Sequence, residues 1–219
     1  EAINRNQAKE LNALLKKSST NLLLVAGLFF VLINANISEL YDFIYFLNGK
    51  KGFALAIPVV FYISVTKLFT AFTGCTDNII TNSPYYYVVP FLSIGSAAAV
   101  VYLNLHFIEQ LGFIGAAWAT FLVITVFNLI KMGLVAKWYG ITPMSRTTLY
   151  LVLLIIGTYF IFISLQLPFN TFINLSLKSS LIALVYLFVC VRFGFSQTVN
   201  DFLSKGYKKI KVYFRVSRP

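Results

Sequence analysis

Lys67 places a positive charge in the middle of an apolar stretch that runs roughly from Phe53 to Cys75. About 20 helical residues span the hydrocarbon core of a bilayer, so this stretch is long enough to cross a membrane. A charge at that depth costs about 3 kcal/mol on insertion scales, and it is usually found facing a bundle interior, a watery cavity or a partner. We therefore expect Lys67 to line a cavity and to attract an anionic substrate such as a phosphate. The structural alternatives are an internal ion pair and a side chain that reaches the membrane boundary.

Further polar side chains accompany Lys67 in the segment SVTKLFTAFTGCTDN. If this segment were one helix, its polar residues would gather on and beside one face, opposite a face rich in phenylalanine. The candidate substrate-binding residues are Lys67, Ser64, Thr70, Asp77 and Asn78.

The chain holds little material for catalysis or metal binding. It contains one histidine, seven acidic residues and two cysteines, Cys75 and Cys190, which fit neither a metal-ligand spacing nor a disulfide framework. Gly-rich phosphate loops and the short motifs of serine hydrolases and zinc peptidases do not occur in the sequence. We expect no enzymatic activity, no cofactor and no metal site.

The composition is typical of a polytopic membrane protein. Hydrophobic residues make up 58% of the 219 residues and charged residues only 11%, against about 25% charged in soluble domains. The net charge of +11 does not indicate nucleic-acid binding, because the basic residues lie at the ends of apolar runs and in one tail. That distribution favours membrane lipids as partners, and no nucleic acid.

Six apolar segments are predicted to be transmembrane helices, because an isolated strand would leave backbone groups unsatisfied in lipid. They cover roughly residues 20–38, 53–75, 86–106, 112–136, 147–167 and 176–193. The predicted fold class is an all-α polytopic helical bundle.

An amphipathic helix is expected before the first span. Residues 4–18 place Leu11, Leu14 and Leu15 on one face, which suits a helix lying along the membrane surface. We divide the chain into a cytoplasmic linker helix (1–19), a transmembrane bundle (20–193) and a basic cytoplasmic tail (194–219).

The basic residues predict the orientation. With the N-terminus inside, the opposite side receives only Lys50, Lys51 and Lys178, and the remaining loop and tail cations face the cytoplasm. Six spans return the tail to the same side. The chain does not begin with methionine, so we expect the numbering to start inside a longer protein.

Small and polar residues suggest helix contacts. GFIGAAWAT repeats small residues four apart, as at Gly115 and Ala119, which lets two membrane helices approach closely. Asn34 and Asn36 are expected to bond to neighbouring helices or to cap a helix end, and Lys131 to anchor a helix at the interface.

Three segments together resemble a known family. NRNQAKELNALLKKSSTNLLL resembles the cytoplasmic linker helix of polysaccharide flippases, and TKLFTAFTGCTDNIITNSPYYY the helix–loop–helix that follows it. GFIGAAWATFLVITVFNLIKM resembles the family's Gly-x-x-Gly-Ala-Ala-x-Ala-Thr signature. The family is the polysaccharide transporter branch of the multidrug/oligosaccharidyl-lipid/polysaccharide exporter superfamily. The resemblance extends over most of residues 4–146, and the sequence departs from the family pattern at Pro84 and Asp77.

The resemblance implies a fold of two helical lobes around a central cavity, of which this chain would be most of the C-terminal lobe. It implies a flippase in the bacterial inner membrane, with both termini of this fragment cytoplasmic. The substrate would be an undecaprenyl-pyrophosphate-linked oligosaccharide for O-antigen and lipopolysaccharide, capsule or exopolysaccharide biosynthesis, moved by alternating access. Further partners would be the missing N-terminal lobe or a glycan polymerase.

Three alternatives stay open. A multidrug or metabolite antiporter of the same superfamily would favour an acidic, aromatic cavity, whereas this chain offers a central lysine. A membrane-embedded glycan polymerase or acyltransferase would need a larger loop outside the membrane. A truncated half-transporter would have no independent activity.

Overall fold

The computed structural model describes residues 8–48, 56–165, 168 and 170–195, and these residues form helices and turns without a strand. The helices are α1 (Ala8–Ala35), α2 (Ile37–Asn48), α3 (Ile57–Thr73), α4 (Thr76–Thr81), α5 (Val88–Leu111), α6 (Phe113–Tyr139), α7 (Arg146–Ile163) and α8 (Thr171–Arg192). The predicted all-α fold class is confirmed. Lys50, Lys51 and all of the predicted tail except Gly194 and Phe195 lie outside the described residues.

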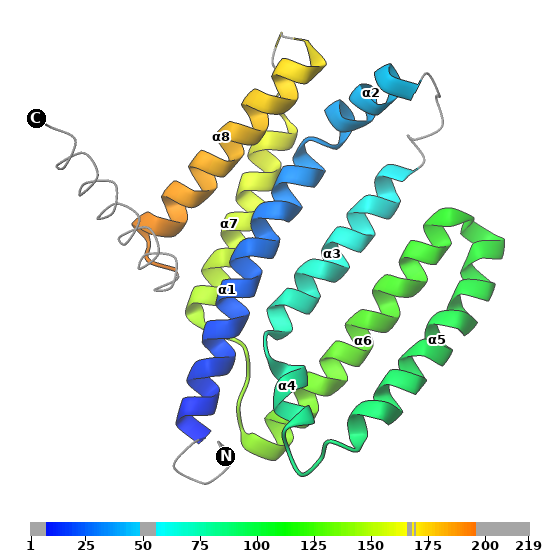
Figure 1. Ribbon diagram of the computed structural model, residues 1–219, viewed down its shortest axis with the longest axis vertical. Coiled ribbons are helices and arrows are strands. Elements are labelled where there is room, and N and C mark those ends of the chain that lie inside the picture. The colour runs from blue at the N-terminus through cyan, green and yellow to red at the C-terminus, as the bar shows by residue number, and fades with distance from the viewer. Residues whose placement is uncertain (1–7, 49–55, 166–167, 169, 196–219) are drawn as a thin grey trace, which may run out of the picture.

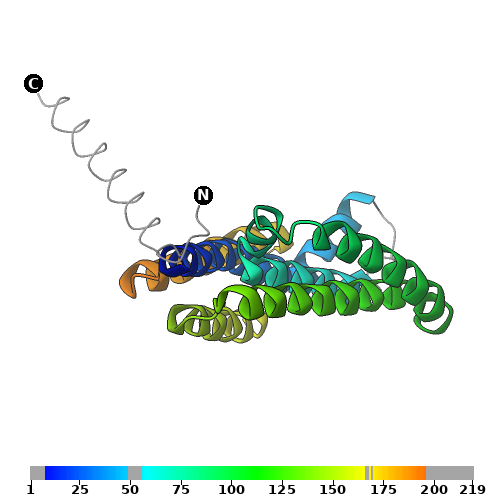
Figure 2. The ribbon, with the colours of Figure 1, turned by 90° about the horizontal axis from the view of Figure 1, so that it is seen from below.

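The long helices alternate in direction along the chain. Helices α1, α5 and α7 run one way, and α3, α6 and α8 run the other way (Figure 1). Short α2 and α4 lie at opposite ends of the bundle. Helix α1 packs against α3, α7 and α8, while α5 packs mainly on α6 and forms one edge. Seen from its end, the bundle is an open slab of helices rather than a closed ring (Figure 2).

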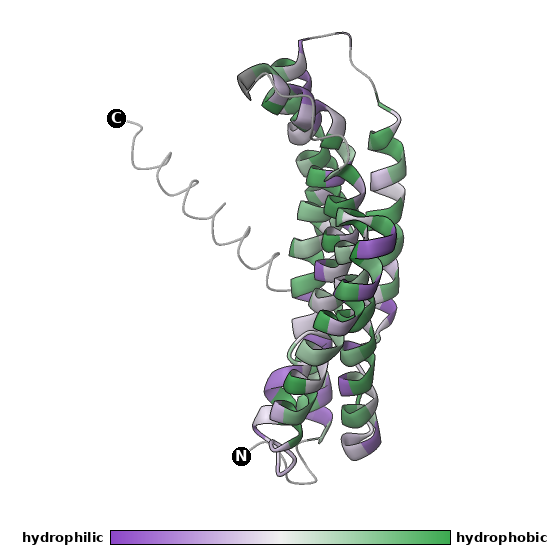
Figure 3. Ribbon diagram, turned by 90° about the vertical axis from the view of Figure 1, so that its right-hand side faces the viewer, coloured by the Kyte–Doolittle hydropathy of each residue, from purple (hydrophilic) through white to green (hydrophobic). Residues whose placement is uncertain are grey.

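Five helices are long and apolar enough to cross a membrane, namely α1, α5, α6, α7 and α8, and α3 is a shorter apolar helix. Hydrophobic residues dominate the middle of the helices, and hydrophilic ones gather toward the ends (Figure 3). Each of the six predicted spans overlaps one of these helices. The chain is therefore a multi-pass membrane protein.

The main core lies where α1, α7 and α8 meet. Val31 of α1, Leu151 of α7 and Ile182 of α8 are fully buried there. Tyr186 of α8 is fully buried too, and its hydroxyl donates to the carbonyl oxygen of Leu24 at 3.0 Å. Because a buried hydroxyl without a partner is costly, this bond fixes α8 against α1.

Helix α2 was not predicted as a separate element. The Asn36 amide donates to the Leu32 carbonyl at 2.7 Å and to the Ser179 hydroxyl of α8 at 3.3 Å. The Asn34 amide donates within its own helix, to Phe30. Asn36 thus caps the end of α1 and contacts a neighbouring helix, as predicted, and α2 turns away after it.

Helix α1 continues without a break through residue 19, where the sequence had suggested a boundary between surface helix and first span. Part of the apolar face expected to rest on the membrane surface packs on protein, whereas Leu14 is 56% exposed. Leu15 is fully buried against Ile79 and Ile80 of α4 and Val135 of α6. Leu15 is buried because α4 and the end of α6 present an apolar surface to this part of α1. The cytoplasmic location of residues 1–19 stays a prediction.

The small residues at the start of α6 have unequal roles. Gly115 and Ala119 are buried, and a Cβ at Gly115 would overlap the Phe107 carbonyl group of α5. By contrast, a Cβ at Gly112 or Gly133 would meet nothing within 4 Å. Close approach of α5 and α6 therefore depends on Gly115, as predicted for this small-residue pair.

We predict that Gly115→Ala destabilises the bundle, because the added methyl group can be accommodated only if two backbones separate. Overpacking of this kind costs about 1–3 kcal/mol. Thermal unfolding in detergent, followed by circular dichroism, should give a lower midpoint for Gly115→Ala. Gly133→Ala in the same helix is the control and should not lower it. Equal midpoints for the two variants would contradict the packing argument.

Candidate functional site

Helix α3 carries the central candidate, Lys67, and is held against α1 at its C-terminal end. Gly74 ends the helix with φ of +61°, and a Cβ there would lie 2.7 Å from the Ser19 backbone nitrogen. Only glycine suits both conditions. The Ser19 hydroxyl donates to the Phe72 carbonyl at 2.6 Å. That bond satisfies one of the carbonyl groups that a helix end leaves without a partner.

The break at Gly74 divides the predicted polar face. Ser64, Lys67 and Thr70 lie on α3, whereas Asp77 and Asn78 lie on the separate helix α4. The projection of all five residues onto one helix therefore does not hold, because the backbone turns at Gly74. Their role in binding a substrate stays a prediction.

Lys67 is exposed. Within the described part of the chain, it makes no hydrogen bond or ion pair. Successive residues of a helix rotate by about 100°, so Lys67 lies on the side of α3 opposite Val65 and Phe72, which pack on the core. The structure therefore leaves this ammonium free on an open face of the slab.

Contacts between α3 and α6 give the depth of Lys67. The two helices run in the same direction (Figure 1). On the N-terminal side of Lys67, the ring of Tyr62 in α3 lies 4.8 Å from that of Trp118 in α6. On the C-terminal side, the Asn128 amide of α6 donates to the Thr70 hydroxyl of α3 at 3.3 Å. These contacts bracket the middle of α6. Lys67 thus lies midway along the span.

The two hydroxyl candidates on α3 already use their protons. Ser64 donates to the Val60 carbonyl at 2.7 Å, and Thr70 donates to the Thr66 carbonyl at 3.0 Å. A hydroxyl has one proton and two lone pairs. These side chains can therefore accept hydrogen bonds from a ligand without disturbing the helix, but they cannot donate one.

Asp77 pairs with a cation of the same chain. Its Oδ1 lies 2.9 Å from Nζ of Lys131, with side-chain exposures of 63% for Asp77 and 18% for Lys131. Lys131 was expected only as an interfacial anchor. Asn78 is exposed, and its carbonyl oxygen accepts from the backbone and side chain of Asn82. With 63% of its side chain exposed, Asp77 remains accessible to water or a ligand. An exposed ion pair of this kind contributes little stability.

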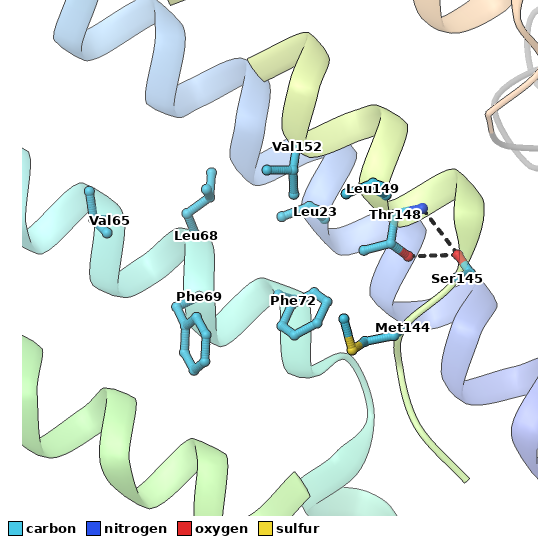
Figure 4. A pocket seen from close by; sticks show the side chains of 10 residues that line it. All are labelled: Leu23, Val65, Leu68, Phe69, Phe72, Met144, Ser145, Thr148, Leu149 and Val152. Carbon is cyan, nitrogen blue, oxygen red and sulfur yellow. Dashed lines mark hydrogen bonds between the residues drawn. The ribbon is translucent and has the colours of Figure 1, made fainter. Parts of the chain in front are cut away.

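An apolar cavity of about 310 Å³ lies on the core side of α3, between α3 and α7 and beside Leu23 of α1 (Figure 4). It includes Leu23, Leu68, Phe72 and Val152. Its polar edge is the start of α7, where the Ser145 hydroxyl accepts from the Thr148 backbone N–H. This cavity can hold a hydrocarbon segment, and Lys67 lies on the opposite side of α3.

A buried ion pair was missed in the sequence. Nζ of Lys178 in α8 lies 2.8 Å from Oε1 of Glu39 in α2, with side-chain exposures of 3% and 18%. The orientation rule had assigned Lys178 simply to the outer boundary. The available signal was a lysine inside the apolar helix α8, but its partner lies far away in the sequence.

No group of three His, Cys, Asp or Glu side chains in the described ranges is placed to hold a metal ion. No protein-family model, curated protein or solved structure matches this chain.

The Lys178–Glu39 pair leads to a stability prediction. Lys178→Met leaves the Glu39 carboxylate without its counter-ion in a largely buried place, and breaking a buried pair costs about 3–5 kcal/mol. We expect a clearly lower unfolding midpoint in detergent for this variant. The double variant Lys178→Met/Glu39→Leu should recover most of the loss, because no unpaired charge remains.

Arg192→Met is the matched control, since Arg192 is an exposed cation on the same helix. It should leave the midpoint unchanged. A midpoint for Lys178→Met equal to that of Arg192→Met would show that the pair does not stabilise the bundle.

Proposed function

We propose that this chain is part of a flippase for an undecaprenyl-pyrophosphate-linked oligosaccharide in the bacterial inner membrane, serving O-antigen, capsule or exopolysaccharide biosynthesis. The chain moves the substrate and makes or breaks no bond in it. The observation that carries the proposal is Lys67, an exposed cation midway along α3 without a partner in the described part of the chain.

The energetics of Lys67 favour a watery cavity over lipid. An ammonium exposed to the hydrocarbon core costs about 3 kcal/mol on insertion scales. Tyr186 and Lys178, also within apolar helices, bond to protein partners. Lys67 has no such contact, so we infer that its face of the slab borders water and a second helical body.

The ionic contacts of the described residues favour an anionic ligand over a cationic one. The carboxylates of Glu39 and Asp77 are each paired with a lysine, so neither is an unpaired anion for a cationic drug. Lys67 can attract a pyrophosphate, while Ser64 and Thr70 offer lone pairs that accept from sugar hydroxyl groups. This difference favours a glycan flippase over a multidrug antiporter.

Alternating access follows from the same arrangement. Substrate bound between this slab and the second body stabilises the arrangement that it contacts on both sides. Rocking of one body against the other then exposes the cavity to the opposite side of the membrane. The second body is the remainder of the same protein or a partner chain.

A substitution at Lys67 tests this proposal. In the native protein, expressed in its own cell, Lys67→Ala should lower glycan export at least tenfold, because the ammonium that attracts the pyrophosphate is removed. Lys67→Arg keeps the charge and should retain part of the activity. Surface glycan, measured by immunoblotting at matched protein levels, reports the export.

Lys137→Ala is the control, because Lys137 is an exposed cation in the last turn of α6. Export by Lys137→Ala should equal that of the unchanged protein. Full export by a well-expressed Lys67→Ala variant would refute the assignment of Lys67 to the substrate cavity. Equal losses for the two variants would point to general charge effects instead.

A further inference from the structure

A second, polar cavity lies where α1, the start of α7 and the end of α8 come together. Its volume is about 380 Å³. Lys16, Lys17 and Thr20 line it from α1, Thr147 from α7, and Gly194 from the turn after α8. None of its nine lining residues is acidic. The cavity is therefore complementary to an anion.

Four side chains of this cavity carry donors that no described residue uses. Lys16, Lys17, Thr20 and Thr147 have no hydrogen-bond or ion-pair partner among the residues that the structure describes. Thr20 is the most telling, because it is only 7% exposed. A buried hydroxyl normally finds a partner. The Thr20 hydroxyl oxygen is not one of the fully buried oxygens that lack a partner, so it opens on the cavity and can donate to a ligand there.

The start of α7 adds to the positive potential. Ser145 lines the cavity and caps α7, accepting from the Thr148 N–H at 3.1 Å. The helix runs for 18 residues from Arg146, and the N-terminus of a helix carries partial positive charge. A phosphate in the cavity would lie beside this N-terminus as well as the two lysines.

An apolar groove continues from the polar cavity between α7 and α8. Its volume is about 780 Å³, and Leu153, Leu154, Val189 and Phe193 contribute to it. It shares Thr147, Gly194 and Phe195 with the polar cavity. The ligand that suits both parts has an anionic head joined to a hydrocarbon chain.

The sequence places this pair of cavities at the membrane boundary. The apolar run of α1 starts just after Asn21, that of α7 starts at Leu149, and that of α8 ends at Val191. Phosphates of membrane lipids lie at this level, next to the hydrocarbon core. A basic pocket between transmembrane helices at this boundary is a common form of lipid-headgroup recognition.

We propose that an anionic phospholipid binds here, with its phosphate at Lys16, Lys17 and Thr20 and one acyl chain in the groove between α7 and α8. The lipid joins α1, α7 and α8 at one end of the bundle. This proposal does not depend on the transport function, since a phospholipid of the surrounding membrane is the ligand.

Lipid binding to the purified full-length protein tests the proposal. The measurement is native mass spectrometry from a mild detergent, with phosphatidylglycerol, phosphatidylcholine and glycerol 1-phosphate as probes. We expect the dissociation constant for phosphatidylglycerol to be at least tenfold lower than that for phosphatidylcholine. Lys16→Gln/Lys17→Gln should remove most of this preference, and Thr20→Val should weaken it severalfold without a change of side-chain size.

Lys9→Gln/Lys137→Gln is the matched control, because it removes two exposed cations outside the cavity. It should bind phosphatidylglycerol like the unchanged protein. Phe193→Ser, in the exposed wall of the groove, should weaken binding of the lipid but not of glycerol 1-phosphate.

Two results would overturn the proposal. An equal loss of binding in the control variant would show that diffuse surface charge, rather than this cavity, attracts the lipid. Competition by glycerol 1-phosphate at the same concentrations as the lipid would show that the cavity serves a soluble phosphate.

Discussion

A polar side chain on a membrane helix must find a partner or border water, and this requirement organises the structure. Two lysines within apolar helices meet it in opposite ways. Lys178 is buried and bonded to Glu39, so α2 and α8 are joined at one end of the bundle. Lys67 is exposed midway along α3, without a partner in the described ranges. Lys178 thus connects two helices of the fold, whereas Lys67 requires water or a partner outside the described residues.

The same requirement decides what the hydroxyl groups can do. Those of Ser19 and Tyr186 donate to carbonyl groups of other helices and position α3 and α8 against α1. Those of Ser64 and Thr70 donate along α3 itself. A cavity bordered by α3 would therefore divide its recognition, with the ammonium attracting negative charge and the hydroxyl oxygens accepting from sugar hydroxyls. Phosphate and sugar would be recognised by different chemistry on one helix face.

Hydropathy was enough to predict the fold class and the six apolar segments, because apolar length alone identifies a membrane helix. It could not predict α2, whose 12 residues are too few to span a membrane. Nor could it predict how α3 ends. Gly74 was visible in the sequence, but the turn there follows from the contact with Ser19 of α1. The Lys178–Glu39 pair joins residues 139 positions apart, so only the folded chain brings it together.

Helix α5 shows what the slab requires from its surroundings. The structure buries none of its residues, and Phe91, Ile94 and Tyr102 are largely exposed. Lipid chains are as apolar as these side chains, so a hydrophobic driving force does not hold α5 in place within a membrane. Close packing must do so instead, at Gly115 beside the Phe107 carbonyl group and at Gly95, where a Cβ would lie 3.4 Å from the Phe127 ring. Apart from α6, α5 contacts mainly α4, so most of its surface is left for lipid or for a neighbouring body.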